Sequence, residues 1–548
     1  MTSSEHVEIE SKFEVDTDTP VPSPDAFAPL TADEPVVHRL SATYLDTEDL
    51  SLTRHKVTLR RRTGGDDEGW HLKLPAAAGR VELRAPLGDA DEVPAELVGA
   101  VAGLVRRRPL SPVARVDNER HVLLLRDGDG EPVVEFCDDN VSTESFTGVA
   151  VGGGTWREWE IELVDPDRAG ADEQLATVAE ACTEAGAVPS SSPSKLARAI
   201  GSLPAAFPPG VSAVKDTLAA DLSQLLDHDP GARRGTMVGI HQMRVAVRGL
   251  RSTIATFASE LEVETEDTDL DLPTLLGELK VLAAVLGKVR DLQVVDERLE
   301  ALAAEFPDDL VSPVTRARIR TELSGEERRA QARVEAALTS ERYLDLVDRL
   351  HELVEVAGTA PGAGRAGKDA GKDDGKGGGK KHRRAAEDMV LRGVDRQFAK
   401  FTKVRTRTER DLESLDLTLA QREELTHVVR KRAKALRRNV SALPESGGLS
   451  VAPLRTACQR LHTVLGDVQD SVTSRLWLRR IARRAEAAGE STFGLGVLYE
   501  HERGFSERAL AGFENDAATV TAAYRELAES RRTARRRGRH KGGKKHKH

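Results

Sequence analysis

Polar and apolar residues alternate along the first 165 residues of this chain, in short segments that turn residues separate. The segments at 57–60, 70–73, 133–136 and 156–163 show this two-residue period. Such a period is typical of antiparallel β-strands that have one apolar and one polar face. After residue 209, apolar positions recur with the 3.6-residue period of helices, in long segments rich in Ala, Leu, Arg and Glu. The pattern predicts a mainly antiparallel β half followed by an all-helical half.

Three segments interrupt these periods and suggest the domain boundaries. The string SLPAAFPP at 202–209 breaks regular structure, and the Gly/Lys/Asp-rich stretch at about 358–381 has too few apolar residues to order itself. Residues 531–548 contain no Asp or Glu and many Lys and Arg. We therefore expect an N-terminal domain at 1–203, a Pro-rich linker at 204–211, a helical domain at 212–530 with a flexible insert at about 358–381, and a disordered basic tail at 531–548.

The helical half repeats itself. The residues His241, Arg244, Arg248 and Arg251 recur with identical spacing as His427, Arg430, Lys434 and Arg437. The string LGKVRD at 286–291 recurs, in the same order along the chain, as LGDVQD at 465–470. Two elements that recur in the same order predict two similar helical bundles.

Composition and charge place the two halves in different roles. Hydrophobic residues make up 39% of the 548 residues and charged residues 31%. The first 200 residues contain 38 Asp and Glu against 20 Lys and Arg, whereas the remainder contain 52 against 60. An acidic half and a basic half point to two different tasks.

The sequence also predicts a cytoplasmic protein. No apolar run approaches the roughly 20 residues that span a bilayer, so we expect no membrane partner. The first ten residues lack the basic segment and apolar run of a signal peptide. Cys137, Cys182 and Cys458 are far apart and in no metal-binding spacing, so we expect reduced, buried thiols.

Charged residues share faces on five predicted strands. Because side chains alternate along a strand, Glu8, Glu10 and Lys12 point to one side. The other sets are Lys56, Thr58, Arg60 and Arg62; His71 and Lys73; Arg80, Glu82 and Arg84; and Glu158, Glu160 and Glu162. A solvated face is the ordinary explanation of one such strand. Separate clusters of carboxylates and of cations are what a complex of metal and polyanion requires, and a closed barrel would turn them inward.

Several of these segments, in order, resemble the CYTH domain, the triphosphate tunnel metalloenzyme superfamily. They are the Glu-x-Glu-x-Lys start, YLDTEDLSLTRHKVTLRRRT at 44–63, WHLKLP at 70–75 and EWEIEL at 158–163. The resemblance covers about residues 5–200 and implies a closed antiparallel β-tunnel that binds triphosphate and a divalent metal, Mg²⁺ or Mn²⁺. Members of the superfamily include inorganic triphosphatases, thiamine triphosphatases and class IV adenylyl cyclases.

The resemblance also implies roles for individual residues. Glu8, Glu10, Glu160 and Glu162 would bind metal and, with Lys12, form the catalytic set; Glu158 and Asp138 are further metal candidates. Lys12, Arg60, Arg62, Lys73, Arg115 and Arg120 would contact phosphate, and Lys195 would close the site. The cationic wall and a metal would stabilise the transferred phosphoryl group, while a second metal or a glutamate would position the attacking water. We expect His6, His55 and His71 to be incidental.

The repeated basic residues of the helical half fall on one stripe of each helix. Neither residues 237–258 nor residues 426–444 contain an Asp or Glu, so the usual i,i+4 partners are missing. A solvated helix surface is the ordinary explanation of a basic stripe. Two such stripes without acidic neighbours favour an external anion, and two facing helices would form a groove for a phosphate chain.

These stretches, over about residues 212–530, resemble the CHAD domain, a helical module that binds inorganic polyphosphate. The matching residues are His241, Arg244, Arg248, Arg251, Lys280 and Arg290 in the first repeat, and His427, Arg430, Lys434 and Arg437 in the second. Gln469 replaces the basic residue of the first repeat, and Lys434 replaces an Arg, so the second repeat is expected to bind less firmly. The histidines are either ligands or packing residues that orient the arginines.

Three functions remain open from the sequence. The first is a metal-dependent hydrolase of inorganic triphosphate or short polyphosphate whose helical domain captures the anion. The second is a non-catalytic polyphosphate-binding protein associated with polyphosphate granules, and the third is a class IV adenylyl cyclase. Nucleic acid is a secondary partner, through the basic tail alone.

Overall fold

The computed structural model describes residues 4–76, 79–88, 92–146, 154–201, 213–258, 261, 268–357, 378–414, 416–441 and 450–543. The chain divides into two compact units, Met1–Gly287 with Gln331–Ala363, and Lys288–Ala330 with Gly364–His548. The expected linker at 204–211 and most of the expected insert, residues 358–377, lie outside the described residues.

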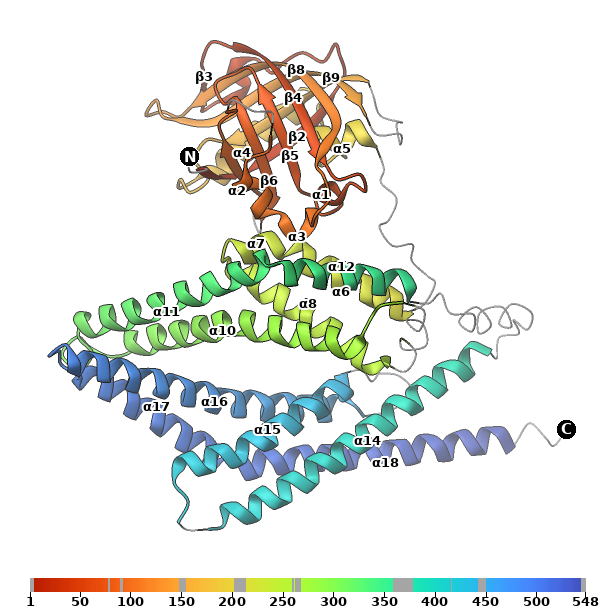
Figure 1. Ribbon diagram of the computed structural model, residues 1–548, viewed down its shortest axis with the longest axis vertical. Helices are drawn as coiled ribbons and strands as arrows, with labels where there is room; N and C mark the ends of the chain where they lie inside the picture. The colour runs from red at the N-terminus through yellow and green to blue at the C-terminus, as the bar shows by residue number, and fades with distance from the viewer. Residues whose placement is uncertain are drawn as a thin grey trace. The chain divides into compact units, whose positions relative to one another are not determined.

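The N-terminal part of the first unit is one antiparallel sheet. Its strands are β1 (Ser4–Glu8), β2 (Glu10–Val15), β3 (Thr31–Ala32), β4 (Val36–Asp46), β5 (Thr58–Thr63), β6 (Gly69–Pro75), β7 (Arg80–Ala85), β8 (Ser111–Arg126), β9 (Pro132–Ser145), β10 (Thr155–Leu163) and β11 (Val188–Pro189). The hydrogen-bonded order is β1-β7-β6-β5-β4-β8-β9-β10-β2-β11, with β3 paired to β8. β1 pairs with β7 at one end of this path, and β2 pairs with β10 near the other. Because only Ile9 separates β1 from β2 along the chain, the sheet curls round into a tunnel (Figure 1).

The outer surface of the tunnel is its apolar face. Phe136 and Trp159 project outward and pack with Phe27 beneath α4 (Ala171–Glu184). A second apolar cluster reaches the inner face instead: Val116 of β8 lines the cavity and belongs to one cluster with Ile200 of α5 (Lys195–Ile200). The short elements η1 (Pro24–Phe27), α1 (Ser51–Arg54), α2 (Ala95–Ala100) and α3 (Ala102–Val105) complete the cover. Burial of these apolar side chains leaves the charged side chains of the alternate positions facing inward.

Helices complete the first unit. They are α6 (Ala213–Asp227), α7 (Asp229–Arg233), α8 (Met237–Thr256), α12 (Glu341–Val356), the start of α10 (Leu272–Ala304) and the end of α11 (Pro313–Thr339). The buried Asp229 carboxylate accepts hydrogen bonds from Arg233 Nε (2.6 Å) and Tyr343 Oη (2.7 Å). A buried carboxylate with two such donors fixes how α7 packs on α12.

The second unit is helical. Its elements are α14 (Gly378–Leu412), α15 (Leu419–Ser441), α16 (Ala452–Ala487), α17 (Phe493–Ala511) and α18 (Phe513–Gly543), with the remainder of α10 and α11. Residues such as Phe401, Leu436 and Leu461 form its core. Part of the stretch from residue 531 that was expected to be a disordered tail is helical, because α18 continues to Gly543. The many Arg residues of this stretch are good helix formers.

The predicted fold class is confirmed: an antiparallel β N-terminal half is followed by an all-helical half. The two repeated bundles stay a prediction. Within the described ranges, no helix has the length and apolarity needed to span a membrane.

Candidate functional site

The tunnel encloses a cavity of about 570 Å³ whose wall is charged. Nearly all the tunnel residues expected from the sequence line it: Glu8, Glu10, Lys12, Arg60, Arg62, Lys73, Arg120, Glu160, Glu162 and Lys195. Arg115 lies elsewhere, half-exposed beside Asp117 (3.1 Å). Asp138 also points away from the cavity and accepts hydrogen bonds from Arg157 Nε (2.7 Å) and Trp159 Nε1 (3.1 Å).

One side of the cavity carries a row of carboxylates. Glu10 on β2 lies opposite Glu162 on β10, which lies opposite Glu135 on β9. Directly opposed residues in antiparallel strands have Cβ atoms about 5 Å apart. Burial, with the carboxylates of Glu8 and Glu10 nearby, raises the pKa of Glu162 to about 7. We call Glu10, Glu135 and Glu162 the acidic row.

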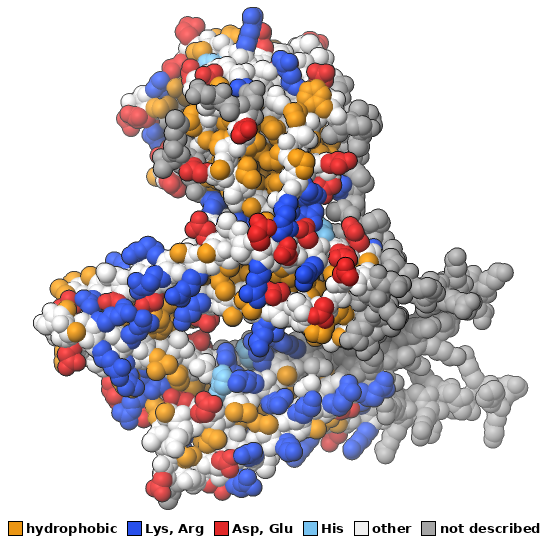
Figure 2. All heavy atoms as spheres, viewed as in Figure 1, with side chains coloured by type: hydrophobic (Ala, Val, Ile, Leu, Met, Phe, Trp, Pro, Cys, Tyr) orange, Lys and Arg blue, Asp and Glu red, His pale blue; other side chains and the backbone are white. Residues whose placement is uncertain are grey.

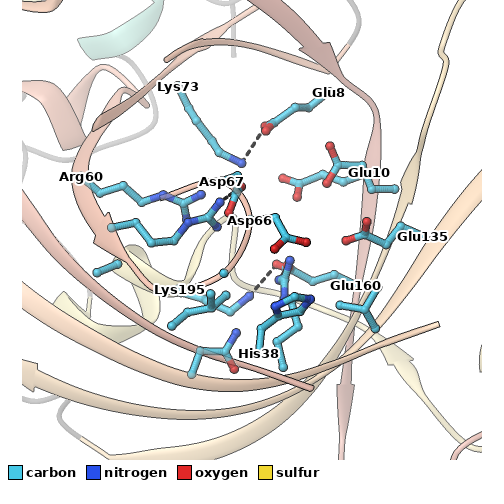
Figure 3. A pocket seen from close by; sticks show the side chains of 18 of the residues that line it. Glu8, Glu10, His38, Arg60, Asp66, Asp67, Lys73, Glu135, Glu160 and Lys195 are labelled. Atoms are coloured by element: carbon cyan, nitrogen blue, oxygen red, sulfur yellow. Dashed lines mark hydrogen bonds and ion pairs between the residues drawn. The ribbon is translucent and has the colours of Figure 1, made fainter. Parts of the chain in front are cut away.

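The acidic row has the chemistry of a divalent-cation site. Mg²⁺ and Mn²⁺ prefer carboxylate oxygens, and a cation relieves the repulsion that raises the pKa of Glu162. Figure 3 shows Glu10 and Glu135 pointing from the same side toward the middle of the tunnel. The sequence did not single out Glu135, although its two-residue spacing from Cys137 and Asp139 on β9 places all three on the inner face.

The opposite side of the cavity carries cations. Arg60 and Arg62 come from β5, Lys73 from β6 and Arg84 from β7. Glu82, fully buried on β7, joins them: its carboxylate lies 3.7 Å from Arg60, 3.8 Å from Lys73 and also contacts Arg84. Burial opposes ionisation, but a hydrogen bond with His71 and the charges of Lys73 and Arg60 hold the pKa of Glu82 far below its usual value.

This arrangement fixes the cations at their positions. Glu82 compensates part of the charge of Arg60, Lys73 and Arg84 and shares it among these three groups. The sequence placed Glu82 on a charged strand face without giving it a role. Lys73 also reaches Glu8 of β1, with Nζ 2.7 Å from Oε2 (Figure 3).

A second cationic cluster lies at Lys195, the first residue of α5. Its Nζ atom is 2.9 Å from Asp139, 2.7 Å from Glu158 and 2.7 Å from Glu160. Arg120 donates to both oxygens of Asp139 at 2.7 Å and also contacts Glu160. Lys12 contacts Glu160 as well.

Oxygen atoms of Asp139, Glu158 and Glu160 lie within 4.8 Å of one another, a spacing that suits a metal. The Lys195 ammonium already lies among these oxygens. Lys12, Lys195 and Arg120 hold the pKa of Glu160 well below its usual value against the effect of burial. Glu160 thus pairs with three cations, and its expected role as a metal ligand stays a prediction.

The basic stripes of the helical half lie in separate units. His241, Arg244, Arg248 and Arg251 are on α8 in the first unit, and Lys280 is exposed on α10. A side chain at Gly287 would lie 4.0 Å from the Arg244 guanidinium. Arg290, on the same helix, lies 3.1 Å from Glu297.

The second unit repeats the close approach of arginine and glycine. His427, Arg430, Lys434 and Arg437 lie on α15, and a side chain at Gly466 of α16 would lie 3.6 Å from Arg430. His462 of α16, which the sequence did not single out, lies beside these cations; burial and the charges of Arg437 and Arg430 lower its pKa to about 4. Lys and Arg side chains gather on the helices of the visible face (Figure 2).

Comparison with known proteins gives two adjacent family matches. Residues 6–200 match the CYTH domain and residues 216–479 match the CHAD domain. Two uncharacterized proteins of Mycobacterium tuberculosis, from strains H37Rv and CDC 1551, are each 35% identical to this chain over 554 residues, which covers 97% of this chain and 98% of theirs.

Among solved structures, the comparison finds PptA from Streptomyces chartreusis, with 17% identity, a TM-score of 0.37 and coverage of 56% of this chain and 99% of that one. Another is HpAC1 from Hippeastrum, a suggested adenylyl cyclase with a dominant triphosphatase activity. It has 18% identity and a TM-score of 0.21, and the match covers 35% of this chain and 93% of that one.

Proposed function

This chain belongs to the family in which a CYTH domain is followed by a CHAD domain, and on that premise we propose that its tunnel hydrolyses inorganic triphosphate or short polyphosphate with Mg²⁺ or Mn²⁺. The observation that carries the proposal is the division of the cavity wall. A row of carboxylates faces a wall of cations across a cavity with a volume of about 570 Å³. A phosphate chain with its metal needs both kinds of surface at once.

The cations bind the phosphate oxygens. Arg60, Arg62 and Lys73 offer N–H donors from one side, and Lys12, Arg120 and Lys195 from another. Fixed donors of this kind stabilise charge that develops on the transferred phosphoryl group, because they need no reorganisation during the reaction. Glu82 and Glu160 hold these donors in position.

The acidic row, together with Glu8, would hold the divalent cation. Bound there, the cation would supply charge neutralisation and lower the pKa of a water molecule. A carboxylate of the row would orient an attacking water molecule and accept its proton. The water oxygen forms a bond to the terminal phosphorus atom while the anhydride bond breaks, which yields orthophosphate and a chain shorter by one phosphate.

The helical half captures longer polyphosphate. His241, Arg244, Arg248, Arg251, Lys280 and Arg290 form one set of contacts, and His427, Arg430, Lys434 and Arg437 the other. Arg side chains give bidentate contacts to phosphate, and a run of them along a helix suits a repeating anion. The proposal places the protein in the cytoplasm, where polyphosphate granules would supply its ligand.

The assay that tests the proposal offers the purified protein tripolyphosphate, long-chain polyphosphate and ATP, each with Mg²⁺ or Mn²⁺. Orthophosphate and cyclic AMP are both measured. We expect orthophosphate from tripolyphosphate and no cyclic AMP. Cyclic AMP from ATP would favour a cyclase, and binding of polyphosphate without turnover of any substrate would favour a binding protein; either result would contradict the proposal.

A further inference from the structure

The turn between β5 and β6 is folded against the neighbouring strand β4. It has the sequence GGDDE at 64–68, and both glycines have positive φ angles, +82° at Gly64 and +78° at Gly65. A Cβ atom at Gly64 would lie 2.2 Å from the backbone oxygen of Arg39. Glycine therefore permits both the backbone conformation and the close approach, and the turn has a defined position.

This position directs two carboxylates into the tunnel. Asp66 and Asp67 line the cavity, and the Asp67 carboxylate pairs with Arg62 of the cationic wall. The backbone oxygen of Asp67 also lies 2.9 Å from His71 Nε2. In Figure 3 both aspartates reach toward the middle of the tunnel, between Arg60 and the acidic row.

Asp67 differs from the carboxylates of the tunnel wall in its exposure. Its side chain is 39% exposed, whereas those of Glu82 and Asp139 are fully buried and that of Glu8 is 2% exposed. Those three come from strands, and Asp67 comes from a turn. Arg62, its partner, has its pKa lowered to about 9 by burial and by the charges of Arg60 and Arg120.

We propose that Asp66 and Asp67 form an acidic stop that limits the length of the phosphate chain in the tunnel. This inference rests on the proposed function, since it assumes that the cationic wall holds phosphate. A chain that extends past Arg62 brings its next phosphate against two carboxylates. Like charges about 4 Å apart cost about 1 kcal/mol even in water and more in a partly buried site. The stop thus selects triphosphate by repelling longer chains, because a binding site often gains specificity from groups that repel the wrong ligand.

The test removes the charges and keeps the shape. The double variant Asp66→Asn/Asp67→Asn is compared with wild type for binding of tripolyphosphate and tetrapolyphosphate by calorimetry, in EDTA so that no metal-dependent turnover intervenes. Both proteins also carry Arg244→Ala/Arg430→Ala, which weakens binding by the helical half. We expect the affinity for tetrapolyphosphate, relative to tripolyphosphate, to rise about fivefold or more, since each like-charge contact removed is worth about that factor. Asp66→Asn alone keeps the pair of Asp67 with Arg62 and should give a smaller rise.

The control is Glu68→Gln, which removes the same charge from an exposed residue of the same turn that does not line the cavity. It should leave the ratio of affinities unchanged. The inference is overturned if the double variant leaves the ratio as in wild type, or if Glu68→Gln raises it equally. Absence of binding of either chain to wild type in EDTA would overturn the inference, which needs the cationic wall alone to hold phosphate. Absence of turnover of tripolyphosphate in Mn²⁺ would overturn the proposed function.

Discussion

Replacement of Lys195 by methionine tests how the cationic wall is held. Three carboxylates lie within 2.9 Å of Lys195 Nζ, and its side chain is 9% exposed. Loss of the ammonium leaves Asp139, Glu158 and Glu160 with less than their full charge compensation. Removal of one partner from a buried ion pair costs about 3–5 kcal/mol of unfolding free energy. For a domain of this size that corresponds to a decrease in Tm of about 6–20 °C.

The pH dependence of this loss identifies its cause. Despite burial, the carboxylates of Asp139, Glu160 and Glu158 raise the pKa of Lys195 well above its usual value, so its contribution is fully present at neutral pH. The pKa of Glu160 is lowered, so its contribution is present at neutral pH and is lost as the pH falls through the acidic range. In Lys195→Met these carboxyls bind protons more readily. The difference in Tm from wild type should therefore shrink between pH 7.5 and pH 5.

Thermal unfolding measured by differential scanning calorimetry checks this prediction. Because oxygens of the three carboxylates lie within 4.8 Å of one another, Mn²⁺ should restore part of the Tm of Lys195→Met. The control is Arg115→Met, which removes a half-exposed cation of the same domain and should change the stability by less than about 0.5 kcal/mol. A loss below about 1 kcal/mol at pH 7.5 would refute the reasoning, as would a loss of the same size at pH 5.

Three further predictions follow from the site and the helical half. Because the pKa of Glu162 is raised from 4.5 to about 7, the metal-free folded protein binds this proton more tightly than the unfolded chain does. The Tm of the metal-free protein should therefore fall as the pH rises from 5 to 8, and Glu162→Gln should remove that decrease. The variant Arg244→Ala/Arg430→Ala should weaken binding of long-chain polyphosphate about tenfold or more in calorimetry, because hydrogen bonds to charged groups contribute about 1.5–3 kcal/mol. Its turnover of tripolyphosphate should be nearly unchanged. Bound polyphosphate should raise the pKa of His462, now lowered to about 4, in an NMR titration, because the anion offsets the charges of Arg437 and Arg430.

Each of these predictions has an outcome that contradicts it. A Tm of Glu162→Gln that follows wild type at every pH would show that another group titrates. Equal loss of both activities in the arginine double variant would mean that the two domains form one site. A pKa of His462 that polyphosphate leaves unchanged would place the anion away from α15 and α16. As a control for the double variant, Arg320→Ala/Arg503→Ala removes two exposed arginines outside the stripes.

The sequence predicted the inward residues well where strand alternation decides the face. Glu8, Glu10 and Lys12 occupy alternate positions and were therefore expected on one face, and all three line the tunnel cavity. Arg115 and Arg120 lie an odd number of positions apart on β8, so a regular strand cannot turn both inward. The alternation itself contained that information, but the resemblance to the family drew both residues into the site.

Cross-strand partners could not be predicted in the same way. Glu135 faces Glu162, and Asp139 faces both Arg120 and Glu158, through the register of strands that are distant in sequence. Register depends on which strands pair and how the barrel closes, and alternation along one strand does not specify either. The position of Asp67 was hidden for a similar reason, since it depends on how two glycines fold a turn back over β4.

The release of orthophosphate from tripolyphosphate in Mn²⁺ tests the central claim most directly. Wild type, Glu10→Gln and Arg115→Met are compared at equal concentration. We expect turnover by wild type and by Arg115→Met, whose arginine lies outside the cavity. Glu10→Gln should lose at least about 100-fold, because one carboxylate of the proposed metal site is gone. No release by wild type, or unchanged release by Glu10→Gln, would contradict the claim.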